Sequence, residues 1–274
     1  MENFNQQTYN PERGENMKKL LVLLVAVCAV SVLAESIVLK TIDFETSEGY
    51  TAGDLLNQNG WYGIWSGSNR QMVVNDSTVA PSGSQYVDMD YDAENGVNSA
   101  VKFDVSQDFK DGNKLRISWY SRGSEISGKM HYTKLHNIGT TGKNYDVEIA
   151  EFTIDGSGKA KLSVSKEDKT GTTDIEKMLT NPTDWHFCQL TVDPADKTIK
   201  EWVLDDEVIF DGTAVYYYKN EGYYANKGLG GNLIDGVRIM NYGAFDGFKV
   251  EMVPEPAVFG LIALLGLFFA RKQR

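Results

Sequence analysis

The fold is decided by residues 185–210, which read WHFCQLTVDPADKTIKEWVLDDEVIF. Apolar and polar residues alternate from Trp185 to Asp193, and this period of two predicts a half-buried β-strand that ends at an Asp-Pro pair. Residues 197–204 alternate in the same way and predict a second strand after a tight turn. Asp205 and Asp206 then turn the chain into a third strand at 208–210. The stretch therefore predicts three consecutive strands joined by short turns.

Strand signals of the same kind recur along most of the chain. Alternating stretches lie at 86–92, 115–121 and 160–166, and Asn-Gly or Asp-Gly pairs, which favour hairpin turns, separate many of them. The one segment that favours a helix is short and spans residues 173–179. Many short strands with regular turns predict an all-β fold of two packed antiparallel sheets.

The composition is that of an ordinary globular protein. Of the 274 residues, 42% are hydrophobic and 24% are charged, which excludes a disordered, collagen-like or disulfide-stapled chain. There are 27 Lys and Arg residues against 38 Asp and Glu residues, a net charge of −11. Because phosphate contacts require clustered Lys and Arg, this acidic chain is not expected to bind nucleic acid.

Three parts of the chain together resemble the laminin-G and concanavalin A-like jelly rolls. They are the strand-turn-strand pattern of residues 185–210, the opening stretch 42–45 and the closing stretch 245–250. The resemblance implies a two-sheet antiparallel jelly-roll sandwich in which the first and last strands pair. Asp206-Glu207 stands where this family usually has Asp-Gly. We assign residues 35–252 to this domain.

The N-terminal region resembles an export signal. Met17 and two lysines precede the apolar run 20–30, and small residues follow it, so residues 17–34 predict a signal peptide cut between Ala34 and Glu35 by signal peptidase. A lipoprotein cut before Cys28 is the alternative, but Val27 does not suit it. Residues 1–16 are polar and acidic, which indicates an upstream extension before a true start at Met17.

The C-terminal region, residues 253–274, resembles the sorting signal of PEP-CTERM proteins. It has three parts: a proline-rich motif, the apolar run 257–270 and a basic tail. The apolar run predicts a short transmembrane segment that holds the precursor in the inner membrane, with the basic tail in the cytoplasm. The resemblance implies processing by an exosortase-like sorting enzyme in a Gram-negative-type bacterium, followed by location at the cell surface or in the extracellular matrix. The residues of this signal are Pro254, Glu255, Pro256, Arg271, Lys272 and Arg274.

The case for catalysis is weak, and the chain is predicted not to be an enzyme. Retaining glucanases of the jelly-roll class carry Glu-x-Asp-x-Glu on one strand, and the closest match here is residues 146–152. Aligned from Glu148, Ala150 replaces the assisting Asp and Phe152 takes the place of the second Glu, unless a β-bulge re-aims Glu151. A glycoside hydrolase or lyase with an atypical site is therefore the alternative. The three histidines, His131, His136 and His186, form no zinc motif.

A structural calcium ion is the only cofactor that the sequence suggests. Asp43 and Glu45 lie on the predicted first strand and Asp246 lies near the last. If these strands pair, as the resemblance implies, the three carboxylates converge, and oxygen ligands of this kind bind calcium.

Aromatic residues in Gly- and Asn-rich segments are the candidate ligand-binding residues. Trp61, Tyr62 and Trp65 form one group, and Tyr217 and Tyr223 belong to a second. Exposed rings of this kind stack on sugar rings, although aromatic residues in a sandwich also fill the core. The sequence therefore predicts an exported protein with a non-catalytic, adhesive jelly roll that binds an extracellular polysaccharide. A purely structural matrix protein is the second alternative.

Overall fold

The computed structural model describes residues 36–63, 71–90, 97–102, 113–137, 147–165, 172–215 and 234–254. Within this range, residues Ile37–Val253 form one compact unit. The predicted signal peptide and all of the predicted sorting signal beyond Pro254 lie outside the described residues.

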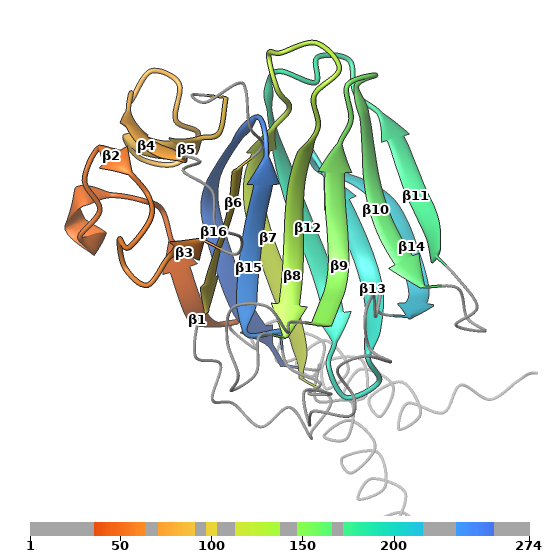
Figure 1. Cartoon of the computed structure of the whole chain (residues 1–274). Coiled ribbons are helices and arrows are strands. Elements are labelled where there is room, and N and C mark those ends of the chain that lie inside the picture. The colour runs from red at the N-terminus through yellow and green to blue at the C-terminus, as the bar shows by residue number, and fades with distance from the viewer. Residues whose placement is uncertain are drawn as a thin grey trace, which may run out of the picture. The chain divides into compact units, whose positions relative to one another are not determined.

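The described residues form an all-β sandwich of two antiparallel sheets (Figure 1). The front sheet has β15, β8 and β9 nearest the viewer in Figure 1, and the back sheet lies behind it. The order of the front sheet is β3 (Tyr62–Gly63), β6 (Val97–Lys102), β15 (Gly236–Asn241), β8 (His131–Asn137), β9 (Val147–Ile154), β10 (Lys159–Ser165) and β11 (Thr172–Met178).

The back sheet holds the remaining strands. Its order is β2 (Gly53–Asp54), β4 (Met72–Asn75), β5 (Gln85–Asp88), β16 (Ala244–Val253), β7 (Lys114–Arg122), β12 (Trp185–Asp193), β13 (Thr198–Leu204) and β14 (Glu207–Val215). Strand β1 (Ile37–Ile42) also pairs with β16, and a single turn of 3-10 helix spans Thr46–Glu48. Among the described residues, the only backbone pairing between the two sheets joins Ser165 of β10 to Val215 of β14.

The three strands predicted from residues 185–210 are confirmed. Strand β12 pairs with β13, and β13 pairs with β14, through the turn at Asp205 and Asp206. Both turn residues have a positive φ, 49° and 65°, as a two-residue hairpin turn requires. The predicted pairing of the first and last strands is also confirmed, because Ile42 of β1 lies opposite Phe248 of β16.

The predicted helix at residues 173–179 is wrong, because this segment is strand β11. It pairs with β10 along its whole length, with Ile175 opposite Leu162. The spacing of Ile175 and Leu179 fits one face of a helix, but a segment this short forms few helical hydrogen bonds by itself. The neighbouring strand offers a complete ladder, so tertiary pairing decides its structure.

Aromatic rings from both sheets fill the space between them. Trp119 of β7 meets Phe152 of β9 with ring centroids 5.7 Å apart, and Phe152 meets Trp202 of β13 at 6.0 Å. All three side chains are at most 1% exposed. Cys188 is buried in the same core, as expected for an inert thiol, and burial raises its pKa well above the ordinary value.

A histidine lies inside the core within a closed hydrogen-bond network. His131 Nδ1 is 3.0 Å from the carbonyl oxygen of Tyr242, and Nε2 is 3.0 Å from Ser121 Oγ and 2.9 Å from Thr133 Oγ1. Trp119 donates its indole N–H to Ser121 Oγ. Burial lowers the pKa of His131 to about 4, so the ring is neutral at physiological pH. The network satisfies buried polar groups and has no access to solvent.

Candidate functional site

A row of polar residues crosses the outer face of the front sheet at one level. Tyr62 lies opposite Ala100, which lies opposite Arg238, and the pairing continues across β8, β9, β10 and β11. We call these residues the polar row; in order they are Tyr62, Arg238, Lys134, Glu151, Ser163 and Asp174.

Strand alternation places the polar row on the side away from the core. Leu135, Phe152 and Val237 are next to row residues in sequence, and each is at most 1% exposed within the core. Since successive side chains of a strand point to opposite faces, the row lies on the outer face. Lys134 and Arg238 are nevertheless buried there.

The polar row is connected by short side-chain contacts. Lys134 Nζ lies 2.5 Å from Glu151 Oε2, and Ser163 donates its hydroxyl to Asp174 Oδ1 at 2.7 Å. The Lys134 ammonium also lies 5.7 Å from the centre of the Tyr132 ring, and burial raises the pKa of this tyrosine. Donors and acceptors along the row are therefore paired with one another, and half-buried Tyr62, Tyr132 and Glu151 and exposed Asp174 are the accessible groups on this face.

The strand that resembles the glucanase motif contains a bulge. Leu135 pairs with Ala150 but His136 pairs with Glu148, so the ladder skips Ile149. By register, positions 148 and 151 then fall on the same face of the sheet. The bulge that the sequence required for re-aiming Glu151 is therefore present. Glu151 is held by Lys134, however, and the side chain of Glu148 lies outside the described residues.

The predicted aromatic group is divided by the structure. Trp61 is 1% exposed, donates its indole N–H to Tyr50 Oη at 3.0 Å and packs beside Phe44. This corrects the expectation of an exposed ring, because a buried Trp61 offers no face to a sugar. Tyr62 is half-buried and belongs to the polar row. Trp65, Tyr217 and Tyr223 lie outside the described residues.

The three predicted calcium ligands gather around one loop, residues 82–85. Ser82 donates its backbone N–H to Asp246 Oδ2 at 3.1 Å and its hydroxyl to Asp43 Oδ1 at 3.4 Å. Glu45 accepts the backbone N–H groups of Ser84 and Gln85, at 2.6 and 2.8 Å, and the Ser84 hydroxyl at 2.7 Å. Burial by itself would raise the pKa of the Glu45 carboxyl group. The hydrogen bonds from Ser84 and Gln85 outweigh this effect and lower the pKa below its ordinary value.

The carboxylates fit a cation only in part. Asp246 is fully buried, its Oδ1 has no hydrogen-bond partner, and burial raises its pKa to about 8. Both oxygens of Glu45 are occupied by protein donors. Within the described ranges, no group of three or more His, Cys, Asp or Glu side chains is arranged to hold a metal ion. The calcium ion stays a prediction.

The terminal signals cannot be followed in the structure. Pro254 is the last described residue after β16, and no helix in the described part of the chain has the length and apolarity to cross a bilayer. The residues that lie outside the described part are Ala34, Glu35, Glu255, Pro256, Arg271, Lys272 and Arg274.

Comparison with known proteins returned solved structures alone. No protein-family model and no curated protein matches the chain. An endo-1,3-beta-glucanase from Streptomyces sioyaensis matches with 11% identity and a TM-score of 0.45, covering 80% of this chain and 96% of that one. The T. cruzi calreticulin globular domain matches with 11% identity and a TM-score of 0.44, covering 86% and 95%. The Caenorhabditis elegans galectin LEC-6 matches with 9% identity and a TM-score of 0.32, covering 57% and 89%.

Sequence reasoning missed most of the polar row. Tyr132 and Lys134 alternate with buried residues along β8, and that alternation was the available signal. Arg238 joins them only because β15 pairs with β8, a contact between residues about 100 positions apart in sequence.

Proposed function

We propose that this chain is an exported protein of the bacterial surface or extracellular matrix whose jelly roll binds a polysaccharide without cleaving it. The observation that carries the binding function is the polar row, with Tyr62 at one end and Tyr132 beside its centre. Sugar hydroxyls both donate and accept hydrogen bonds, and a sugar ring also has an apolar face that stacks on aromatic rings. The accessible groups on this face are the half-buried rings of Tyr62 and Tyr132 and the carboxylates of Glu151 and Asp174, which supply stacking surfaces and hydrogen-bond acceptors.

The binding test uses the purified full-length chain on a glycan array, with a polysaccharide depolymerisation assay in parallel. We expect binding without product. Tyr62→Ala should weaken binding by roughly 5-fold, because an aromatic contact contributes about 1 kcal/mol. Tyr120→Ala, a half-buried tyrosine on the outer face of the back sheet, is the matched control and should leave binding unchanged. Absence of binding to every glycan would favour the purely structural matrix protein.

A glycoside hydrolase is the second candidate, and the bulge at Ile149 is the observation that favours it. Two carboxylates on one face are the minimum for acid and nucleophile roles. The depolymerisation assay tests this candidate. If it shows turnover, and if Glu148→Gln and Glu151→Gln each abolish that turnover, the chain is an enzyme and the non-catalytic proposal is wrong.

We also propose that signal peptidase and an exosortase-like enzyme process the two ends of the chain. The support is the three-part pattern at residues 253–274 and the charged, apolar and small-residue order at residues 17–34. Mass spectrometry of the surface-located protein should find Glu35 as the first residue and no peptide from the basic tail. Recovery of a peptide that contains residues 2–13 or Arg271 would contradict this processing.

A further inference from the structure

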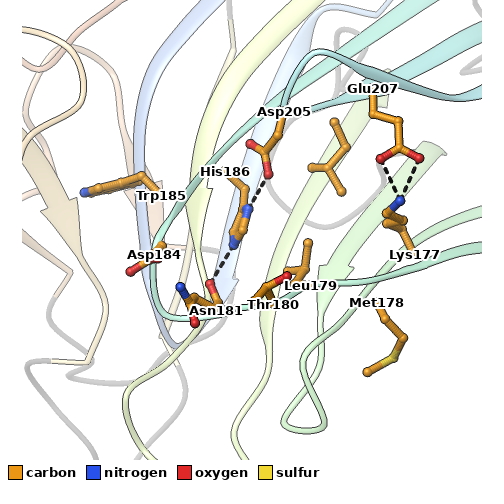
Figure 2. Close-up of a pocket in the computed structure, with 11 residues that line it drawn as sticks. Lys177, Met178, Leu179, Thr180, Asn181, Asp184, Trp185, His186, Asp205 and Glu207 are labelled. Atoms are coloured by element: carbon orange, nitrogen blue, oxygen red, sulfur yellow. Dashed lines mark hydrogen bonds and ion pairs between the residues drawn. The ribbon is translucent and has the colours of Figure 1, made fainter.

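A cavity of about 440 Å³ opens at the edge of the sandwich between β11 of the front sheet and the start of β12 and β14 of the back sheet (Figure 2). The only described pairing between the sheets is at Ser165, whereas the cavity adjoins Met178, which pairs with Lys159 at the opposite end of β10. At ~3.3 Å per residue, these two points lie about 20 Å apart. The cavity lies at this end, where the described residues form no backbone pairing between the two sheets.

Two fixed polar pairs stand on opposite sides of the cavity (Figure 2). Lys177 of β11 contacts both carboxylate oxygens of Glu207 of β14 at 2.6 Å and so bridges the two sheets. On the other side, His186 Nδ1 lies 2.6 Å from Asp205 Oδ2, and its Nε2 lies 2.9 Å from the carbonyl oxygen of Asn181. The histidine ring is therefore held at both nitrogens, and this wall of the cavity is preorganised.

Asp205 is itself held by the backbone of β12. Its Oδ1 accepts the Phe187 N–H at 2.9 Å, and its own N–H donates to the Phe187 carbonyl at 2.9 Å. The wall that carries His186 is thus anchored to the hairpin turn predicted from the sequence. A rigid wall of this kind reduces the ordering cost of binding.

The rest of the lining is mainly polar, with a small apolar part. Half-buried Leu179 lies between the two polar pairs in Figure 2, and buried Leu204 also lines the cavity. The loop between β11 and β12 adds Thr180, the Asn181 amide and Asp184, and none of these three side chains makes a hydrogen bond in the described structure. The cavity therefore combines an apolar surface with unused donors and acceptors.

The charges at the cavity exclude an anionic ligand. Three carboxylates, of Asp184, Asp205 and Glu207, face two cationic or titratable groups, Lys177 and His186. Both of the latter already contact carboxylates, so neither is available for a phosphate, sulfate or uronate.

We infer that this cavity is a second binding site, separate from the polar row, and that its ligand is one neutral sugar residue of a glycan. The volume lies within the ~300–1,000 Å³ range of small-ligand sites. The Asp184 carboxylate and Asn181 amide suit the hydroxyl groups of a pyranose, and half-buried Leu179 offers an apolar contact to its C–H face. The site does not depend on the polar row, and it would make the domain bivalent.

The test measures binding of neutral monosaccharides to the purified full-length chain by saturation-transfer NMR, with glucuronate and methylammonium as charged probes. We expect millimolar binding of a neutral sugar alone. Asp184→Ala should weaken it by about 10-fold, because hydrogen bonds to charged groups are the strong ones. Thr180→Trp, at an exposed loop position, should abolish it by filling the mouth of the cavity.

Two controls separate this site from the rest of the molecule. Asp196→Ala removes an exposed carboxylate from the turn between β12 and β13 and should change nothing, and Tyr62→Ala should leave monosaccharide binding intact. The inference is overturned if no neutral sugar binds, if a charged probe binds in its place, or if binding survives both Asp184→Ala and Thr180→Trp. If Tyr62→Ala were the only variant to lose monosaccharide binding, the sugar would bind at the polar row and not in the cavity.

Discussion

Asp246 is the buried carboxyl group whose replacement tests the electrostatics of the domain most directly. It lies on β16, is fully buried, and its Oδ1 has no partner. Burial raises its pKa from 3.8 to about 8, and hydrogen bonds from Gly247 and Ser82 oppose that rise while Asp43 and Glu45 add to it. The folded state therefore favours the protonated acid, whereas the unfolded state ionises near pH 4.

The sign of the effect follows from proton binding. Between pH 3.8 and 8 the folded state holds a proton that the unfolded state has lost. The free energy of unfolding therefore falls as pH rises through this window, and the contribution of Asp246 to stability is complete only below pH 3.8. Each pH step of one is equivalent to about 1.4 kcal/mol, so the loss reaches about 4 kcal/mol at pH 7. Asp246→Asn keeps the acceptor for the Ser82 N–H and removes the titration. D246N should therefore match the wild type near pH 4 and exceed its free energy of unfolding by about 4 kcal/mol at pH 7.

Urea denaturation of both proteins from pH 4 to pH 9 measures this difference, and contributions from other groups cancel between them. A difference that stays constant with pH would refute the reasoning. The same titration examines the predicted calcium ion. If calcium binds beside Asp246, added calcium should restore the stability of the wild type at pH 8 and leave D246N unchanged.

Two further predictions concern the backbone and the core. Gly243 has φ +86°, and a Cβ there would overlap the carbonyl oxygen of Arg122. Gly243→Ala should therefore lower the free energy of unfolding, measured by urea denaturation, by at least about 2 kcal/mol. An unchanged denaturation midpoint would contradict this prediction. Trp202 is fully buried against Phe152, so Trp202→Ala should cost roughly 3–5 kcal/mol. Its indole Nε1 has no hydrogen-bond partner, so Trp202→Phe should cost clearly less, and equal losses in both variants would show that the indole N–H matters after all.

The parts of the fold that could be predicted from the sequence are those governed by local alternation. Strand β12 was predicted with its observed limits because His186, Cys188 and Leu190 alternate with half-exposed residues. Asp205 and Asp206 favour the left-handed backbone of a tight hairpin, so the next turn was also predictable.

The parts that failed depend on contacts between distant segments. Strand β11 resembles a helix until β10 is beside it, and Trp61 resembles an exposed ring until Tyr50 and Phe44 surround it. The cavity was beyond prediction for the same reason, since its walls join residues of β11 to the turn at Asp205. Local sequence reports neither the partner strand nor the space left between two sheets.

The position of β16 has a mechanical consequence if the proposed sorting signal tethers the domain. This strand is hydrogen-bonded on both sides, with Met252 opposite both Ile37 of β1 and Leu115 of β7, and Val253 is the last residue of the compact unit. A force applied at Val253 along the strand acts across hydrogen bonds that run perpendicular to it. Two ladders then share this force in shear, so many hydrogen bonds must break together before β16 separates from its neighbours.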